Sequence, residues 1–213
     1  MSINLWSNAE HSRDYLQRAD SVPHRREGEA TLLEFLPARM DRFLDIGSGA
    51  GRLVSLIRSN RPTACCVALD FSLAMLEELR TRFATDNNIE IVAHDLADPL
   101  PNLGWFDAVV SSFAIHHLTH ERKRILYSEI YALLHPGGIF LNLEHVASPS
   151  AKLHRQFLAT MDLTPETEDP SNKLLDLEVQ LAWLRQIGFT DVDCHWKWRE
   201  LALLAGAKPL RLA

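Results

Sequence analysis

The sequence predicts an α/β fold: a seven-stranded, mostly parallel β-sheet with helices on both faces and an antiparallel hairpin at its C-terminal end. Apolar runs of strand length alternate along the chain with segments whose apolar residues recur three or four positions apart. The runs are apolar almost without interruption, as expected for parallel strands that are covered on both faces. The last two runs have no helix between them, so a hairpin must join them as antiparallel strands.

Each element follows from this alternation. The expected parallel strands are Arg42–Ile46, Cys65–Leu69, Ile89–Ala93, Phe106–Ser111 and Ile139–Glu144. Apolar residues at helical spacing predict helices within residues 53–57, 73–83 and 125–134. The third helix should stop at residues 135–138, because proline cannot continue a helix and glycine permits the reversal into the next strand. The closing hairpin is expected to join residues 188–198 and 201–206.

Length and composition limit the kinds of protein this chain can be. Its 213 residues fit a single domain over residues 1–213. Lys and Arg total 22 against 28 Asp and Glu, a net charge of −6, so nucleic acid is not an expected partner. The chain has no apolar segment of transmembrane length and no N-terminal signal pattern, so we expect no membrane partner and a cytoplasmic location. Cys65, Cys66 and Cys194 are too few and badly spaced for a disulfide framework or a zinc knuckle.

The most informative segment is the turn after the first expected strand, which reads Asp-x-Gly-x-Gly-x-Gly over residues 45–51. Glycine reaches backbone conformations closed to other residues and has no Cβ, so a ligand can lie directly against the chain. The helix that follows offers unpaired N–H groups at its start. We therefore expect a nucleotide-cofactor loop made by Gly47, Ser48, Gly49 and Gly51, with Asp45 nearby.

Polar residues also follow the later strands. In open α/β sheets a ligand binds outside the carboxyl ends of the strands, where the strand order reverses. Asp70 ends the second expected strand, at the place where such folds hold a ribose diol with a carboxylate. The candidate cofactor residues at the ends of the second, third and fourth strands are Asp70, Phe71, Ser72, Met75, His94, Asp95, Leu96, Ser111 and Ser112.

The glycine spacing is tighter than the Gly-x-Gly-x-x-Gly of dinucleotide-binding turns. With the strand-end acids and the Pro-Gly-Gly turn, it resembles the class I S-adenosylmethionine-dependent methyltransferases, in particular the bacterial small-molecule type. The resemblance rests on residues 43–51, 67–72, 93–96, 106–118 and 133–143 and covers roughly residues 25–206. It implies a Rossmann-like fold, S-adenosyl-L-methionine as cofactor, and methyl transfer to a small-molecule acceptor, with oxygen or nitrogen favoured over carbon.

The resemblance implies roles for individual residues. Asp45 suits the ammonium of the cofactor, at least through water, and Asp95 suits its adenine amino group. Phe71 and Met75 are expected to flank the adenine. A backbone carbonyl at the end of the fourth strand is available to the ammonium.

Two segments are expected to cover the ligand. In relatives the N-terminal segment, here residues 1–30, folds as a lid, in which Tyr15 would cover the cofactor and Arg26 would reach its carboxylate. The alternative is a solvated amphipathic helix that packs only against the sheet edge. Residues 148–176 are expected to form a second cover that shapes the acceptor pocket, since active sites tend to lie on loops above a rigid scaffold.

The candidate catalytic residues are His116, His117, Glu144 and His145, which follow the fourth and fifth strands. A hydroxyl acceptor must lose a proton and benefits from such a base, whereas a thiolate, amine or enolate-like carbon needs less help. A histidine here can equally cap the next helix or satisfy buried backbone. A metal site would also draw on His120, but adjacent histidines in an extended turn point apart and no third ligand has recognisable spacing, so no metal is expected.

Two other functions stay open at this point. A nicotinamide or flavin oxidoreductase would also use a glycine loop and Asp70, but it should show the longer glycine spacing and gives no reason for the final hairpin. A non-catalytic cofactor-binding protein is compatible with the same fold, because fold does not fix activity. The sequence is compatible with a monomer or a homodimer.

Overall fold

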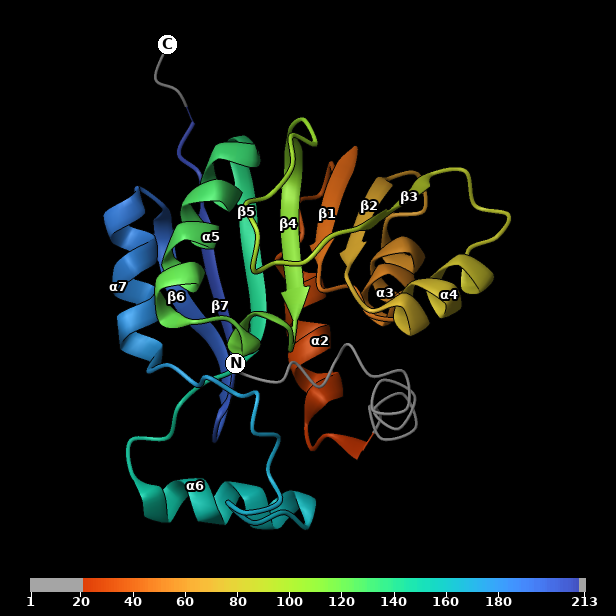
Figure 1. Ribbon diagram of the computed structural model, residues 1–213. Coiled ribbons are helices and arrows are strands. Elements are labelled where there is room, and N and C mark those ends of the chain that lie inside the picture. The colour runs from red at the N-terminus through yellow and green to blue at the C-terminus, as the bar shows by residue number, and fades with distance from the viewer. Residues whose placement is uncertain (1–20, 211–213) are drawn as a thin grey trace.

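The computed structural model of the chain describes residues 21–210 and has a central seven-stranded sheet with helices on both faces (Figure 1). The strands are β1 (Arg42–Ile46), β2 (Cys65–Asp70), β3 (Ile89–Ala93), β4 (Phe106–Ser112), β5 (Leu134–His145), β6 (Thr190–Trp198) and β7 (Leu201–Ala207). The helices are α2 (Arg25–Glu34), α3 (Arg52–Asn60), α4 (Leu73–Arg82), α5 (His120–Leu133), α6 (Ala151–Leu158) and α7 (Leu177–Ile187). Two short 3₁₀ turns are η3 (Ile115–His117) and η4 (Ala159–Met161).

The strand order is β3-β2-β1-β4-β5-β7-β6. Strands β1 to β5 are parallel, and β7 enters antiparallel between β5 and β6. The predicted sheet and its closing hairpin are therefore confirmed. The chain runs outward from β1 to β3 and then returns to the other side of β1 to form β4, so the strand order reverses between β1 and β4, where open α/β sheets bind their ligands.

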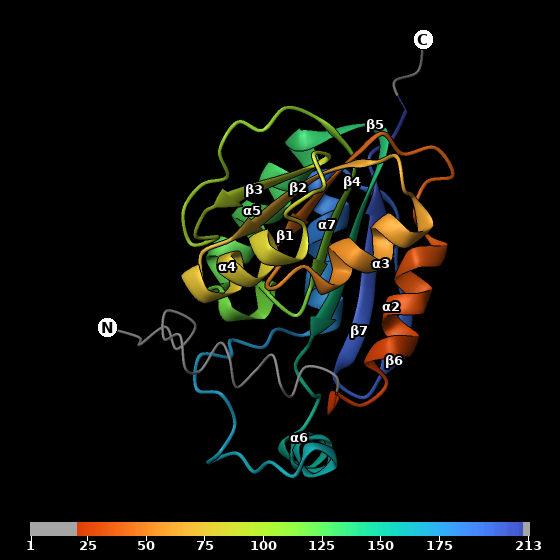
Figure 2. The ribbon, with the colours of Figure 1, turned by 90° about the vertical axis from the view of Figure 1, so that its right-hand side faces the viewer.

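Alternation along the buried strands divides the core into two layers, because successive side chains of a strand point to opposite faces. Phe43 packs with buried residues of α2, α3 and α4, whereas its neighbour Leu44 packs with those of α5 and α7. Figure 2 shows α2 and α3 side by side on one face of the sheet. Near-complete burial of β1, β2 and β4 explains why these strands read as continuous apolar runs.

Strand β5 starts earlier than the sequence predicts. Helix α5 ends at Leu133, and the strand begins at Leu134 instead of Ile139. The residues around the Pro-Gly-Gly turn remain extended because they are bonded on both sides: Leu134 pairs with Phe106 of β4, and Gly137 N–H donates to the carbonyl of Lys208 over 2.8 Å. An irregularity in the β4 register accommodates the extra residues.

The cap segment, which we define as residues 148–176, includes α6 and lies beyond the carboxyl ends of the parallel strands (Figure 1). His154 of α6 anchors it: its Nδ1 lies 3.1 Å from Glu200, in the turn between β6 and β7, and its Nε2 lies 2.9 Å from Glu168. Burial alone would lower the pKa of His154. The hydrogen bonds and negative charges of Glu200 and Glu168 outweigh this effect, so the pKa of His154 is raised. His154 therefore ties the cap segment to the turn between β6 and β7.

Within residues 21–210, no helix is both long and apolar enough to cross a membrane. The same residues hold no group of three or more His, Cys, Asp or Glu side chains arranged to bind a metal ion.

Candidate functional site

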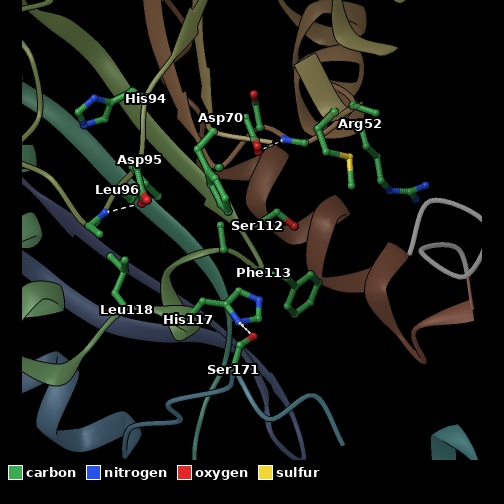
Figure 3. Close-up of a pocket in the computed structure, with 18 of the residues that line it drawn as sticks. Arg52, Asp70, His94, Asp95, Leu96, Ser112, Phe113, His117, Leu118 and Ser171 are labelled. Atoms are coloured by element: carbon green, nitrogen blue, oxygen red, sulfur yellow. Dashed lines mark hydrogen bonds between the residues drawn. The ribbon is translucent and has the colours of Figure 1, made fainter. Parts of the chain in front are cut away.

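A pocket of about 490 Å³ opens where the strand order reverses (Figure 3). Its volume falls within the range of small-molecule sites, about 300–1,000 Å³. Many of the predicted cofactor residues line it: Gly47, Ser48, Gly49, Asp70, Phe71, Met75, His94, Asp95, Leu96 and Ser112. The cap segment contributes Ser171 and Lys173 to the opposite wall. The structure thus gathers residues from four strand ends and from the cap segment around one cavity.

Glycines of the loop after β1 have different surroundings. A Cβ at Gly51 would lie 2.3 Å from Leu79 and 2.6 Å from Phe83, so this glycine lets α3 pack against α4 and does not line the pocket. A Cβ at Gly49 would find only the Met75 sulfur, at 3.9 Å, because this position faces the pocket. Both have positive φ angles, +53° and +78° for Gly49 and Gly51. Gly49 is therefore the position where a ligand can approach the backbone.

The carboxylate of Asp70 holds this loop in place (Figure 3). Its Oδ2 accepts from the N–H of Gly49 over 2.8 Å, and its Oδ1 accepts from the N–H of Ser72 over 2.8 Å. Burial raises the pKa of Asp70, which these backbone hydrogen bonds partly offset. Ser72, predicted as a cofactor residue, donates its N–H to Asp70 but does not line the pocket.

The two serines at the end of β4 have separate surroundings. Ser112 lines the pocket, and its buried Oγ has no hydrogen-bond partner among residues 21–210. Ser111 does not line the pocket. Its Oγ donates to the carbonyl of Ile46 over 2.9 Å and so joins β4 to β1. Alternation along the strand turns the Ser111 side chain away from the pocket, and the contact predicted at this strand end, a backbone carbonyl, stays a prediction.

Asp45 also lies outside the pocket lining, so its predicted contact with the cofactor ammonium, at least through water, stays a prediction. Leu44 and Ile46 face α5, so alternation turns Asp45 toward the opposite layer, where only 1% of it is exposed. Its Oδ2 has no hydrogen-bond partner within the described part of the chain. Burial, helped by the nearby charge of Asp70, raises the pKa of Asp45 to about 8. Asp45 is thus a buried acid behind the glycine loop.

At the N-terminal side, the structure places Arg25 and not Arg26 at the pocket. Arg25 is buried, pairs with Glu29 at 2.8 Å, and lies over the ring of Phe113 at 5.2 Å. Arg26 is exposed, because successive residues of a helix point about 100° apart. Tyr15 lies outside the described residues.

The rest of α2 packs on the sheet. A Cβ at Gly28 would lie 2.7 Å from Leu143 and 2.9 Å from Trp196, so the helix approaches the strands closely at this point. Of the predicted lid, residues 1–30, the structure describes residues 21–30, in which Arg25 lines the pocket and Gly28 lies against the sheet.

Of the four candidate catalytic residues, only His117 lines the pocket. Its Nδ1 lies 2.9 Å from the hydroxyl of Ser171 in the cap segment (Figure 3). The others form a buried layer behind it. The Nδ1 of His116 lies 2.6 Å from Glu144, and the Nε2 of His145 lies 2.8 Å from Glu200.

Burial controls the charge of this layer. It lowers the pKa of His116, and with the neighbouring His116 it lowers the pKa of His117 to about 2. Burial also raises the pKa of Glu144. At neutral pH His117 is therefore an uncharged imidazole.

Several lining residues were not predicted from the sequence: Arg25, Ala50, Arg52, Arg82, Ala97, Phe113, Ala114, Leu118, Thr119, Arg122, Ser171 and Lys173. Phe113 has a positive φ of 55°, which is unusual for a bulky residue and marks the sharp turn that leaves β4. The one signal that pointed to Ser171 and Lys173 was their position in the segment expected to cover the pocket.

Comparison with known proteins identifies relatives of the chain. A family model described as "Methyltransferase domain" matches residues 43–138. The "Demethylmenaquinone methyltransferase" of Clavibacter sepedonicus is 30% identical over 183 residues, which cover 77% of this chain and 71% of that protein. The "Carboxy-S-adenosyl-L-methionine synthase" of Desulforapulum autotrophicum is 30% identical over 224 residues, which cover 93% of this chain and 87% of that protein.

Solved structures share the fold at low identity. An O-methyltransferase family protein from Burkholderia thailandensis aligns with a TM-score of 0.78 and 16% identity over 97% of this chain and 62% of that one. The N-methyltransferase NodS from Bradyrhizobium japonicum, in complex with S-adenosyl-L-homocysteine, aligns with a TM-score of 0.72 and 18% identity over 97% of this chain and 100% of that one. This chain spans about three fifths of the first structure, and at these identities the likeness concerns the fold.

The surroundings of the two glycines predict different effects of the same substitution. Gly51→Ala places a Cβ against Leu79 and Phe83, and such overpacking costs about 1–3 kcal/mol. Gly49→Ala carries a similar backbone strain without the clash and serves as the matched control. Urea unfolding should give the lower free energy of unfolding for Gly51→Ala. Equal losses in the two variants would contradict this packing role.

The pKa of Asp45 predicts a dependence of stability on pH. Between the usual value of 3.8 and the folded value of about 8, the folded chain binds a proton that the unfolded chain has lost, so stability falls as pH rises. Asp45→Asn mimics the protonated acid, so the melting temperature of this variant minus that of wild type should increase as pH rises from about 5 to about 8. The exposed Asp98→Asn is the control. A difference that does not change with pH would refute the assignment.

Proposed function

The chain belongs to the class I S-adenosylmethionine-dependent methyltransferases, and on that premise we propose that it methylates an oxygen or nitrogen atom of a small-molecule acceptor. The observation that carries the proposal is the pocket, which joins a glycine loop and a strand-end carboxylate on one wall to His117 on the other. The cofactor is proposed to lie against the first wall. The acceptor is proposed to lie between His117 and the cap segment.

The residues present suit S-adenosyl-L-methionine. The unpartnered Oγ of Ser112 supplies a buried polar atom at the pocket, and Gly49 offers backbone that no Cβ covers. Asp70 is proposed to bind the ribose diol, and Asp95 the adenine amino group, with Phe71 and Met75 flanking the ring. The further proposed cofactor contacts are Gly47, Ser48, His94 and Leu96, with Arg25 taking the role first expected of Arg26.

The reaction needs orientation above all. The cofactor supplies a methyl group on a sulfonium, and an in-line displacement then depends on holding the acceptor atom close to that carbon. His117 is proposed to accept the proton of a hydroxyl acceptor, because it is the one of the four candidate catalytic residues that lines the pocket. Ser171 positions the imidazole through its 2.9 Å contact with Nδ1.

A second candidate function comes from the relative named as a carboxy-S-adenosyl-L-methionine synthase. In that case the product would be a carboxylated cofactor instead of a methylated acceptor. Mass spectrometry of the nucleoside product distinguishes the two, since methyl transfer leaves S-adenosylhomocysteine. The oxidoreductase alternative is disfavoured by the glycine spacing, and a non-catalytic role would leave the nucleoside unchanged.

Calorimetry tests the cofactor assignment. S-adenosylhomocysteine should bind far more tightly than NAD, and Asp70→Ala should weaken that binding by about 1.5–3 kcal/mol, as for hydrogen bonds to a charged group. Asp95→Asn should cost less, because the amide oxygen can still accept from one amino group. The exposed Asp98→Ala is the control. Tight NAD binding, or an unchanged dissociation constant in folded Asp70→Ala, would refute the assignment.

The base is tested by a comparison of histidines. If the acceptor is a hydroxyl, His117→Ala should lower kcat by about 10²–10⁴-fold while cofactor affinity stays nearly intact. Because burial lowers the pKa of His117 to about 2, wild-type turnover should show no ionisation near the usual histidine value of 6.5. His116, Glu144 and His145 do not line the pocket, so their replacement should act through stability and geometry. Activity of His117→Ala within a few-fold of wild type would exclude base catalysis by this residue.

A further inference from the structure

Lys173 differs from most other cations that line the pocket. Its Nζ donates to two backbone carbonyls, that of His117 at 2.7 Å and that of Ser171 at 3.4 Å, and within residues 21–210 no carboxylate lies at ion-pair distance from it. By contrast, Arg25 and Arg52 each pair with Glu29, and Arg122 pairs with Glu129. Arg82 lies on the exposed end of α4. Lys173 therefore brings a half-buried positive charge, neutralised by no ion pair, to the wall that holds His117.

The position of Lys173 is fixed before any ligand arrives. Its backbone N–H donates to the carbonyl of His116 over 2.9 Å. The ammonium of Lys123, a residue that is 1% exposed, donates to the same carbonyl over 3.3 Å and to the carbonyl of Lys173. A charge held in place in this way binds an opposite charge with little loss of conformational entropy.

The second lysine strengthens the positive potential at this wall. Burial lowers the pKa of Lys123 to about 8, the charge of Glu144 opposes that shift, and the charge of Lys173 adds to it. The two ammonium groups are thus close enough to repel each other. Among nearby acids, Glu144 is buried against His116, and Asp169 acts on the two histidines from the cap segment. An anion beside Lys173 would relieve the repulsion.

We propose that Lys173 binds a carboxylate of the acceptor and so selects anionic small molecules. A lysine ammonium has three donors, of which Lys173 already uses two on carbonyls, so one remains to donate to a carboxylate oxygen. An acceptor anchored at this point lies against His117, the side chain proposed to take its proton. The inference rests on the proposed function and names the substrate class of the same pocket.

The test uses probes that differ only in charge, measured by calorimetry on the full chain saturated with S-adenosylhomocysteine. The probes are 4-hydroxybenzoate and its neutral counterpart 4-hydroxybenzamide. We expect wild type to bind the carboxylate at least about tenfold more tightly, as one charged contact predicts. Lys173→Met should lose that preference and keep its affinity for S-adenosylhomocysteine. The control Lys152→Met, at an exposed position on α6, should retain the preference.

Each contrary result has a definite meaning. Absence of any preference in wild type, or tighter binding of phenyl phosphate than of 4-hydroxybenzoate, would overturn the carboxylate assignment. Weaker binding of S-adenosylhomocysteine to Lys173→Met would also overturn it, since Lys173 would then hold the cofactor's own carboxylate. If S-adenosylhomocysteine does not bind wild type at all, the proposed function fails. In that case the preference for 4-hydroxybenzoate over 4-hydroxybenzamide, measured without S-adenosylhomocysteine, still tests the role of Lys173.

Discussion

The attachment of the glycine loop to the end of β2 is the interaction on which the site depends. Ser48 N–H donates to the carbonyl of Leu69 over 2.8 Å, and Gly49 N–H donates to the carboxylate of Asp70 over 2.8 Å. These contacts hold the loop against the end of β2, beside the point where the strand order reverses between β1 and β4. Without them the backbone at Gly49 would have no fixed relation to the strand ends that form the rest of the wall.

A buried polar layer gives the opposite wall its shape. Glu144 of β5 contacts His116, and Glu200 of the hairpin turn contacts both His145 and His154, so the sheet, the turn η3 and the cap segment are connected through side chains. Buried polar groups are costly unless they are satisfied, and here each carboxylate finds a histidine. The layer therefore holds His117 in position at the pocket, although the residues of the layer do not themselves line the pocket. This explains how two adjacent histidines, with ring centroids 4.0 Å apart, come to have different surroundings.

The sequence predicted the sheet, its hairpin and most of one pocket wall, because these follow from local patterns: apolar runs, glycine spacing and acids at strand ends. It did not predict which neighbour of a pair faces the pocket. Arg25 and Arg26 differ by one helical step, and Ser111 and Ser112 by one strand step, so a shift of a single residue exchanges the inside and outside positions. Ser171 and Lys173 reach the site through contacts with residues more than fifty positions away, which no local pattern records.

A crystal structure of the protein with S-adenosylhomocysteine tests the central claim most directly. The account predicts the ribose hydroxyls within hydrogen-bond distance of Asp70, the adenine between Phe71 and Met75, and the sulfur facing the wall of His117. A ligand bound elsewhere, or one in the same pocket with its adenine against His117 and its amino acid at Asp95, would contradict it.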